Sequence, residues 1–351
     1  MSNLVETLMF PLRQQYPNNF DKHENRDTND GATQIFVKQS TDPLSILDDQ
    51  LRTNIENSFD RTLQIPVFDH EEVVIGDTRS CTMCIEGPDS KIITIDSYTV
   101  VICFDMVPSQ HNNNDVAYQA LFNKKLTNRL LKLKEFIDQK RVDKLEANKN
   151  QHFPQELLDF YSVNGDAFQI AQADKNDFYN NGTAIMSTMR FLGSPDVLVN
   201  PIGMPIVTRL MNQGSANGEN QSFQFMDYRM FHTSNQVVNG DPALESTGYI
   251  VAPGTVATHS RIDPDARRGT DLGTKRWETV NNVPIINMDM GLFYQADCSD
   301  ESQLQTSGTA GLTRTVRESF EWSADIFDIC VYNSDPANRF NPIIKFEVTD
   351  L

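Results

Sequence analysis

The stretch VAYQALFNKKLTNRLLKLKEFIDQKRVDKLEANKN, residues 116–150, decides the architecture of this 351-residue chain. It contains neither Pro nor Gly, and its apolar residues recur at steps of four, three and four: Leu126, Leu130, Leu133 and Ile137. This spacing puts them on one face of an α-helix. At 1.5 Å per residue, such a helix is roughly 50 Å long. A rod of that length favours a subunit that spans a thin, extended molecule over a compact enzyme.

The same stretch is basic within an acidic chain. It holds nine Lys or Arg against four Asp or Glu, whereas the whole chain has a net charge of −18. Tight nucleic-acid binding needs clustered basic residues that displace counterions, and an acidic chain repels phosphates on average. Residues 1–62 hold six basic and ten acidic residues and form no basic arm. We therefore interpret the basic helix face as solvated or paired with acidic neighbours, and expect assembly without nucleic acid.

Composition indicates a folded protein with more than one core. The chain is 39% hydrophobic and 22% charged, and its length exceeds what one hydrophobic core usually serves. No run of about 18 apolar residues is present, and the N-terminus lacks a basic region followed by an apolar stretch, so we expect neither a membrane span nor a secretion signal. Five Cys, an odd number, favour reduced thiols.

Hydrophobic patterns on either side of the long helix predict an α+β protein. Residues 1–40 show little periodicity and indicate an extended arm, followed by an amphipathic helix over 44–59. Residues 63–110 alternate apolar and polar side chains around the turn EGPDS at 86–90, which predicts a long hairpin whose Ile93, Ile95, Val100 and Ile102 are exposed in a free subunit. The apolar parity changes near Ser97, which indicates a bend. Later patterns predict helices at 178–192 and 204–211 and strands at 196–200, 222–231, 248–252, 285–294, 314–322 and 343–348.

Candidate catalytic or metal-binding residues are few. Cys81 and Cys84 form a CxxC pair, but in a strand pattern positions three apart face opposite sides, and no second ligand pair follows. His70 has acidic neighbours: Asp69, Glu71 and Glu72. These could serve a metal-assisted hydrolase, our hypothesis from a different functional class. A solvated surface His explains the pattern more simply, so we assign no catalytic, cofactor-binding or metal residue.

Several segments, taken in order, carry a resemblance to a known family. They are TLQIPV (62–67), YTVVICFDMVP (98–108), NNDVAYQ (113–119), DKLEANK (143–149), DVLVNP (196–201), MPIV (204–207), GYIVAPGT (248–255) and GLFY (291–294). The chain resembles the major capsid protein of tailed double-stranded DNA phages, which has the Hong Kong 97-like fold. Within that group it is most similar to the shell proteins of phages that infect Bacteroidetes.

The resemblance implies a domain organisation and a role. Its implied segments are an N-terminal arm (1–62), an extended loop hairpin (63–110), a peripheral domain (111–194) with a spine helix (116–150), an axial domain (195–321), and strands returning to the peripheral domain (322–351). It implies a structural protein, not an enzyme, without cofactor. Such a protein self-assembles into the hexamers and pentamers of an icosahedral shell, which encloses packaged double-stranded DNA without binding it specifically.

The same resemblance implies the setting in which the chain works. Its partners would be further copies of itself and portal, scaffold and decoration proteins, with no membrane contact. Its location would be the virion, assembled in the cytoplasm of the host bacterium. The alternative is an encapsulin-like nanocompartment shell protein. Such a protein would have the same fold, but its shell would enclose a cargo enzyme in place of DNA.

Overall fold

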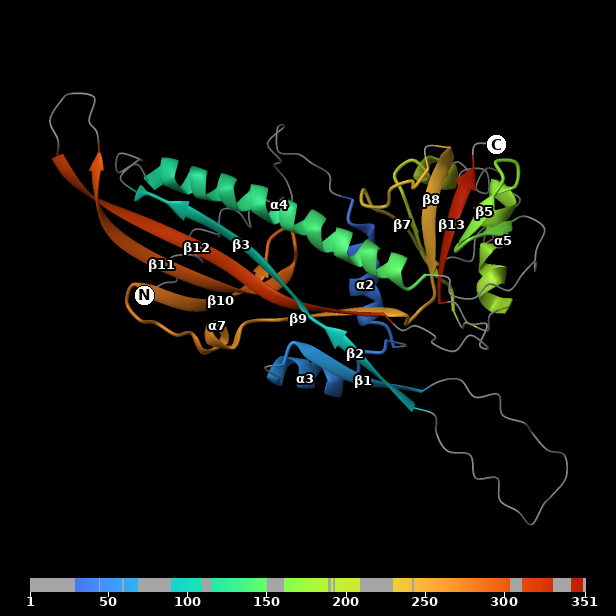
Figure 1. Ribbon diagram of the computed structural model, residues 1–351, viewed down its shortest axis with the longest axis horizontal. Helices are drawn as coiled ribbons and strands as arrows, with labels where there is room; N and C mark the ends of the chain where they lie inside the picture. The colour runs from blue at the N-terminus through green and yellow to red at the C-terminus, as the bar shows by residue number, and fades with distance from the viewer. Residues whose placement is uncertain are drawn as a thin grey trace, which may run out of the picture.

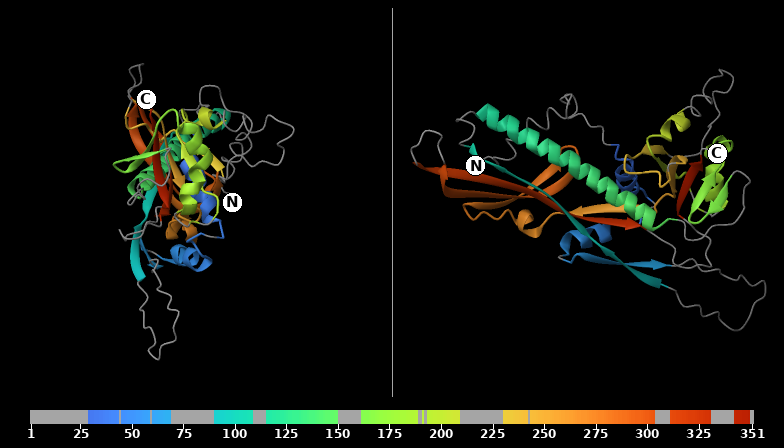
Figure 2. Two further views of the ribbon diagram at one scale, coloured as in Figure 1. Left: turned by 90° about the vertical axis from the view of Figure 1, so that its right-hand side faces the viewer. Right: turned by 45° about the horizontal axis from the view of Figure 1, so that its top comes forward.

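The molecule is elongated and narrow, with helix α4 (Asp115–Ala147) laid along one sheet and a second sheet beyond the end of that helix (Figure 1). Figure 2 gives the end-on and tilted views of the same thin shape. Helices combine with largely antiparallel strands, so the fold is α+β, as predicted. This computed structural model describes residues 29–43, 45–58, 60–68, 90–108, 115–149, 161–188, 191, 193–208, 230–241, 243–303, 311–330 and 342–349.

The longer sheet has five strands, all paired antiparallel: β3 (Tyr98–Met106), β9 (Val256–Arg261), β10 (Lys275–Val283), β11 (Met288–Gln303) and β12 (Gly311–Cys330). The order is β10-β11-β12-β3, and the end of β12 also pairs with β9. Phe320 on β12 stands opposite Phe104 on β3, and Trp322 stands opposite Ile102. Because alternate residues of a strand face opposite sides, the even-numbered residues of β3 and of the paired part of β12 share one face.

Helix α4 covers that apolar face of the five-stranded sheet. It has 33 residues, and the helix predicted over 116–150 therefore runs from Asp115 to Ala147. Four rings lie between helix and sheet with centroids 5.3 to 6.2 Å apart: Phe104, Phe122, Phe320 and Trp322. The residues of the predicted apolar helix face, from Leu126 to Ile137, are buried in the same core.

The second sheet has six strands: β4 (Ser162–Asn164), β5 (Ala167–Ile170), β6 (Asp196–Val199), β7 (Met230–Thr233), β8 (Leu244–Val251) and β13 (Ile343–Thr349). The order is β4-β5-β13-β8-β6-β7, with β13–β5 and β6–β7 parallel and the other pairs antiparallel. Helix α5 (Lys175–Thr188) and a helical turn over 204–208 pack on it. A Cβ on Gly248 would lie 2.5 Å from Phe346, so the close packing of β8 on β13 requires glycine there.

The N-terminal region differs from the predicted extended arm. Residues Gly31–Ser40 form helix α2, which lies between the two sheets, and Asp49–Asn57 form helix α3. Ala32, Ile35 and Phe36 are fully buried and belong to a core shared with α4, β8 and β13. Their spacing of three and four residues is the helical period, which the surrounding Asn and Gln residues obscured in the sequence.

The predicted hairpin over 63–110 is shorter in the structure. Strands β1 (Thr62–Phe68) and β2 (Ser90–Asp96) form an antiparallel two-stranded ribbon, with Leu63 opposite Ile95. Residues 69–89, which include the predicted turn, lie outside the described residues. Strand β3 is separate from the ribbon and pairs with β12. The change of apolar parity near Ser97 therefore marks the point where the chain leaves the ribbon and joins the five-stranded sheet.

The predicted exposure of the hairpin residues was wrong in most cases. Val100 is 1% exposed and Ile102 is 9% exposed, because both lie beneath α4. Ile95 is 5% exposed and packs with α3, β9 and β12, and Ile93 is half-buried against the same cluster. Among the described large hydrophobic residues of 63–110, Ile92 at 67% and Val101 at 49% are exposed, and of these two Ile92 lies in the ribbon.

Each of the two sheets combines strands from distant parts of the chain. Residues 195–321 supply β6, β7 and β8 to the six-stranded sheet but β9, β10, β11 and part of β12 to the five-stranded sheet. Strands β4, β5 and β13, which come from either side of that segment, complete the six-stranded sheet. A linear pattern of strands identifies each strand but not its neighbour, so the pairing of these distant strands is known only from the fold.

Candidate functional site

The residues considered for catalysis or metal binding do not form a site in the described part of the chain. His70, Cys81 and Cys84 fall within residues 69–89, outside the described residues. Among the residues that are described, no group of three or more His, Cys, Asp or Glu is arranged to hold a metal ion. Burial raises the pKa of the Cys330 thiol to about 12, which makes it a packing residue at neutral pH. Within the described helices, none is long and apolar enough to cross a membrane.

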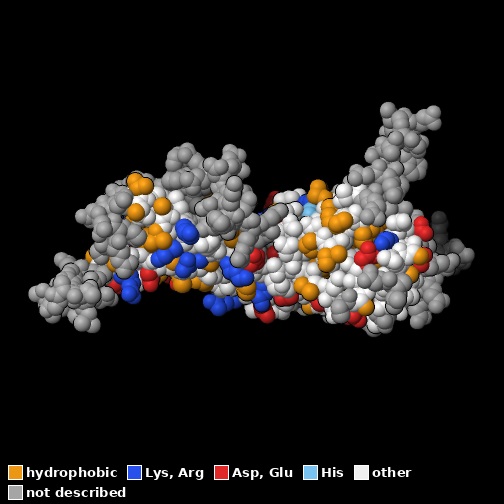
Figure 3. Space-filling model, turned by 90° about the horizontal axis from the view of Figure 1, so that it is seen from above, with side chains coloured by type: hydrophobic (Ala, Val, Ile, Leu, Met, Phe, Trp, Pro, Cys, Tyr) orange, Lys and Arg blue, Asp and Glu red, His pale blue; other side chains and the backbone are white. Residues whose placement is uncertain are grey.

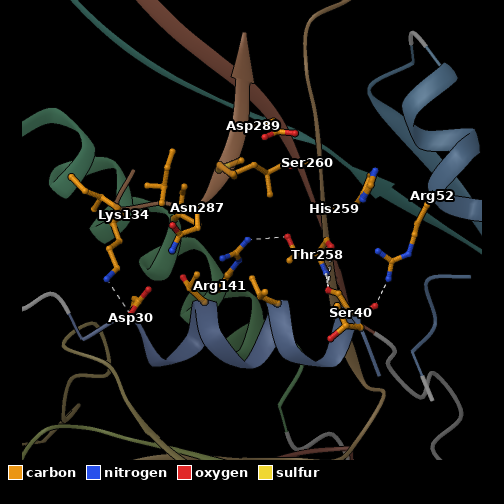
Figure 4. Close-up of a pocket in the computed structure, with 18 residues that line it drawn as sticks. Asp30, Ser40, Arg52, Lys134, Arg141, Thr258, His259, Ser260, Asn287 and Asp289 are labelled. Carbon is orange, nitrogen blue, oxygen red and sulfur yellow. Dashed lines mark hydrogen bonds and ion pairs between the residues drawn. The ribbon is translucent and has the colours of Figure 1, made fainter. Parts of the chain in front are cut away.

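A cavity of about 330 Å³ lies where α2, α4, β9 and the β10–β11 turn meet (Figure 4). Its charged lining residues already have partners: Lys134 lies 3.3 Å from Asp30, and Arg52 donates to the Ser40 carbonyl. Burial lowers the pKa of His259, whose ring nitrogen lies 3.5 Å from Glu56. These contacts hold α2, α3 and α4 against β9. The cavity is therefore better understood as a packing defect at a junction than as a reaction site.

A buried ion pair beside that cavity joins α4 to the five-stranded sheet. Arg141 and Asp328 are 4% and 5% exposed, and the Arg141 Nε lies 3.2 Å from the Asp328 Oδ1. Arg141 also donates to the Thr258 hydroxyl at 2.8 Å, and the Tyr98 hydroxyl donates to the other Asp328 oxygen at 2.7 Å. Burial, followed by the charge of Asp328, raises the pKa of Tyr98 well above its usual value. One cluster thus ties α4, β3, β9 and β12 together.

Asp138 on α4 caps the N-terminus of α2 from another element. Its Oδ1 accepts from the Thr33 backbone N–H at 2.8 Å and from the Thr33 hydroxyl at 3.1 Å. The Ser234 hydroxyl, just after β7, donates to the other oxygen. The local residue Asp30 makes no cap of its own, so Asp138 satisfies a helix end that would otherwise lack an acceptor. Burial raises the pKa of Asp138, although these hydrogen bonds oppose the shift.

Helix α2 joins the two sheets through polar side chains on its last turn. The Gln39 amide donates to Asp196 on β6 at 3.1 Å, and its oxygen accepts from the Val256 N–H on β9 at 3.2 Å. Ser40 exchanges hydrogen bonds with the Thr258 backbone at 2.7 and 3.1 Å. Asp196 lies in the six-stranded sheet and the other two partners lie in the five-stranded sheet. Rotation of one sheet against the other would break these bonds.

The C-terminal end of α4 is attached to the six-stranded sheet by Glu146. Its carboxylate accepts from the Tyr249 hydroxyl on β8 and lies 3.3 Å from the Lys345 ammonium on β13. Burial acts to raise the pKa of Glu146, but hydrogen bonds from Lys149 and Tyr249 and the charge of Lys345 outweigh it and hold that pKa below its usual value. Lys149 also pairs with Asp166 at 2.9 Å, beside β5.

One residue of the long helix could have indicated from sequence alone that a buried polar contact forms there. Arg141 follows Ile137 and precedes Leu145 by four residues each, so it falls on the buried apolar row of the helix. A charge on such a row is buried, and buried charges need partners. The partners themselves, Asp328 and Thr258, could not be identified from spacing, because they are 187 and 117 residues away in the chain.

Basic residues of α4 also occupy the open edge of β3. Among the described strands, β3 pairs only with β12 and forms the end of the strand order. On its other side, Arg129 Nε donates to the Cys103 carbonyl and Lys125 Nζ donates to the Asp105 carbonyl, each at 2.7 Å. Exposed strand edges invite pairing with other chains, and charged side chains placed on them oppose it. Two of the nine basic residues in the predicted basic stretch thus protect an edge.

Comparison with known proteins rests on the fold. No protein-family model matches the chain, and no curated protein matches it. The chain is similar to the solved structure "Cyanophage A-1(L) capsid asymmetric unit", with a TM-score of 0.50 at 9% identity over 95% of this chain and 97% of that chain. Other similar structures are the capsid of cyanophage P-SCSP1u (TM-score 0.44, 10% identity, 83% and 84% covered) and the mature capsid of bacteriophage PhiM1 (0.41, 10%, 83% and 83%). The first likeness spans nearly all of both chains, so this chain has the fold of a phage capsid subunit.

Proposed function

We propose that this chain is the major capsid protein of a tailed double-stranded DNA phage, a shell subunit with no catalytic role. The observation that carries the proposal is the fold likeness to a phage capsid subunit over 95% of the chain. In this function the chain assembles with its own copies into hexamers and pentamers, and the shell associates with portal, scaffold and decoration proteins. Its place is the virion, after assembly in the bacterial cytoplasm.

The arrangement of the two sheets supports a tile-like subunit. A shell subunit must resist bending, since it transmits load between its neighbours. Here a 33-residue helix stiffens the long sheet, and Asp138, Arg141 and Glu146 fix that helix to α2 and to both sheets. We assign the five-stranded sheet with α4 to the peripheral domain of a Hong Kong 97-like fold and the six-stranded sheet to its axial domain.

The ribbon of β1 and β2 suits the role of the extended loop. Its base is held on its own subunit, since Ile65 and Ile95 are 4% and 5% exposed in the core with α3, β9 and β12. The open end of the β1–β2 ribbon points away from the body of the molecule (Figure 1). A two-stranded ribbon is marginal alone in water. We propose that the open end of the ribbon contacts a neighbouring subunit, which stabilises it.

Electron microscopy of purified, nuclease-treated protein tests the proposal. We expect hexameric rings, sheets or closed shells. Moderate salt should promote them, because it screens repulsion between subunits that each carry a net charge of −18. A protein that stays monomeric at every salt and protein concentration would contradict the shell function. Closed shells that contain a cellular enzyme in place of DNA when isolated from the native source would favour a nanocompartment.

Replacing the loop tip adds a second test. Exchanging residues 73–85 for a two-residue turn leaves the described ribbon intact, so the variant should still unfold cooperatively on heating. It should no longer close into shells if the loop works between subunits. Intact shells from this variant would show that the loop is dispensable for assembly.

A further inference from the structure

A buried arginine lies at the base of the β1–β2 ribbon, where the ribbon leaves the body of the subunit. Figure 3 shows many Lys and Arg side chains on the surface of the molecule, where water can solvate them. Arg261 on β9 differs, because only 4% of this residue is exposed. Its guanidinium group lies 5.4 Å from the centre of the buried Phe327 ring. A buried charge needs partners, and those of Arg261 lie on the segments that lead into and out of the ribbon.

The entry of the chain into the ribbon is held by its backbone carbonyls. Arg261 Nη1 donates to the carbonyls of Ser58 and Asp60, at 2.5 and 2.9 Å. Arg267, six residues later in the chain, donates to the Glu56 carbonyl in the last turn of α3. A carbonyl at the end of a helix lacks an intrahelical donor, and a basic side chain can supply one. Two arginines of one short segment thus bind three alternate carbonyls just before β1 begins.

The exit of the chain from the ribbon is held by the ion-pair partner of the same arginine. Arg261 Nη2 lies 2.9 Å from Asp325 Oδ2 on β12, and the Thr99 hydroxyl on β3 donates to Asp325 Oδ1 at 2.7 Å. Asp325 is the register partner of Arg261 on one neighbouring strand and of Thr99 on the other. The Ser97 backbone N–H donates to the Arg61 carbonyl and joins the exit to the entry. We call Arg261 and Asp325 the ribbon clamp.

Hydrophobic packing at the same place stabilises the ribbon without the same directional requirement. Ile65 and Ile95 are buried in one cluster with Leu47, Ile55 and residues of β9 and β12. Burial of apolar surface is not directional. The guanidinium group, in contrast, holds its donors in a rigid planar fork that fits its acceptors in one geometry. The clamp therefore adds an orientation to a contact that apolar packing alone would only hold together.

We propose that the ribbon clamp sets the direction in which the ribbon leaves the subunit, and thereby where its open end meets a neighbouring copy. The inference rests on the proposed function. Arg261 and Asp325 are positioning residues, since they act on assembly through the ribbon. Copies close into a finite assembly only when each repeats the same contact geometry. A ribbon of variable direction would give contacts that do not close.

Distances within dissociated subunits test the clamp directly. Spin labels are attached at Ile92→Cys, on the exposed side of the ribbon, and at Asn128→Cys, on the solvent side of α4. The background carries Ser in place of four native cysteines: Cys81, Cys84, Cys103 and Cys298. Double electron–electron resonance then gives the spread of the distance between the labels. R261Q should widen that spread, because it removes the donors that hold the entry of the ribbon and pair with Asp325.

Two further variants separate geometry from charge and from stability. R261K keeps the positive charge but not the planar fork, so it should widen the spread as R261Q does. Leu47→Ala removes a buried side chain from the same hydrophobic cluster, so it should lower the melting temperature and leave the spread unchanged. An unchanged spread in R261Q, a normal spread in R261K or equal widening in L47A would overturn the positioning role. If R261Q does not fold, the comparison of R261K with L47A decides the question.

Electron microscopy of the same variants tests the consequence for assembly. Both Arg261 variants should give fewer closed particles and more irregular ones than L47A and the unmodified protein. A normal yield of closed shells from both Arg261 variants, despite a widened spread, would overturn the link between clamp and assembly. If the unmodified protein forms no shells, it is the proposed function that fails, and the distance measurement still decides whether the clamp orients the ribbon.

Discussion

The two halves of helix α4 are held in place by different physical interactions. In the N-terminal half, Phe122, Leu126 and Leu130 are fully buried against the aromatic residues of β3 and β12. In the C-terminal half, buried Asp138 and Arg141 make hydrogen bonds and an ion pair to α2, β9 and β12. The apolar half gains stability from removal of surface from water, which is not directional. The hydrogen bonds and the ion pair of the polar half are directional. Each of them forms in only one orientation of α4 relative to α2 and the sheets.

This difference predicts how each half responds to change. An apolar contact can be replaced by another of similar volume at modest cost. A buried charge that loses its partner keeps its desolvation cost, so the loss of one partner is severe and the loss of both is milder. The apolar half should therefore tolerate repacking, whereas the polar half should show strong coupling between pairs of positions.

The largest expected effect comes from the apolar half. Phe122→Ala removes a fully buried ring from contact with three others, and it should lower the free energy of unfolding by about 3–5 kcal/mol. Phe136→Ala, on the same helix at 45% exposure, should cost less than about 0.5 kcal/mol. Urea unfolding of both variants measures the difference. Equal losses would mean that α4 does not bury the face described above.

Breaking the buried ion pair should rank next. Arg141→Met leaves Asp328 buried without its cation and should cost about 3 kcal/mol. The double variant R141M/D328L should recover part of that loss, because it removes the uncompensated charge. A double-mutant cycle with Asp328→Leu measures the coupling. If the free-energy losses of the two single variants simply add in the double variant, Arg141 and Asp328 are not coupled. The polar half would then not differ from the apolar half in this respect.

Two carboxylates of the polar half should respond to pH in opposite directions. Burial raises the folded-state pKa of Asp138, so its contribution to stability is greatest below its ordinary value of 3.8 and declines as pH rises through the raised pKa. The pKa of Glu146 is lowered, so its contribution is present above 4.5 and is lost as pH falls through the lowered pKa. Asp138→Asn should remove the first dependence and Glu146→Gln the second.

Unfolding curves of the two variants and the unmodified protein between pH 3 and 7 measure these slopes. At pH 7, Asp138→Asn should change stability by about 1 kcal/mol or less, because the amide oxygen can still accept from the Thr33 N–H. Slopes of the same sign for both carboxylates would contradict the assigned environments.

The smallest effect on stability, with a separate effect on association, is expected at the β3 edge. K125Q/R129Q removes two donors from exposed carbonyls and should change the free energy of unfolding by about 1 kcal/mol or less. The uncovered edge should raise irregular self-association at low protein concentration, as light scattering would detect. The matched variant K132Q/K140Q keeps both edge donors and should not aggregate. Similar scattering from both variants would show that charge alone, and not edge protection, controls association.

The sequence by itself determined the local elements of this protein. The period of Leu126, Leu130, Leu133 and Ile137 identified a long amphipathic helix, and the patterns at 178–192, 196–200 and 343–348 lie within a few residues of α5, β6 and β13. Such patterns are local, because the orientation of a side chain follows from the dihedral angles of its own segment. The net charge of the chain and the shortness of its apolar runs could also be read from the sequence without knowledge of the fold.

The tertiary structure decided which elements meet. The burial of Val100 and Ile102 follows from the pairing of β3 with β12, which comes more than 200 residues later in the chain. In the same way, the sequence near α2 did not reveal that this helix lies between the two sheets. Arg141 stood out as a charge on an apolar row, yet only the fold brings Asp328 to it. Pairing between distant strands depends on complementary faces and on the entropy of closing long loops. The hydrophobic period of a single segment contains no information about either.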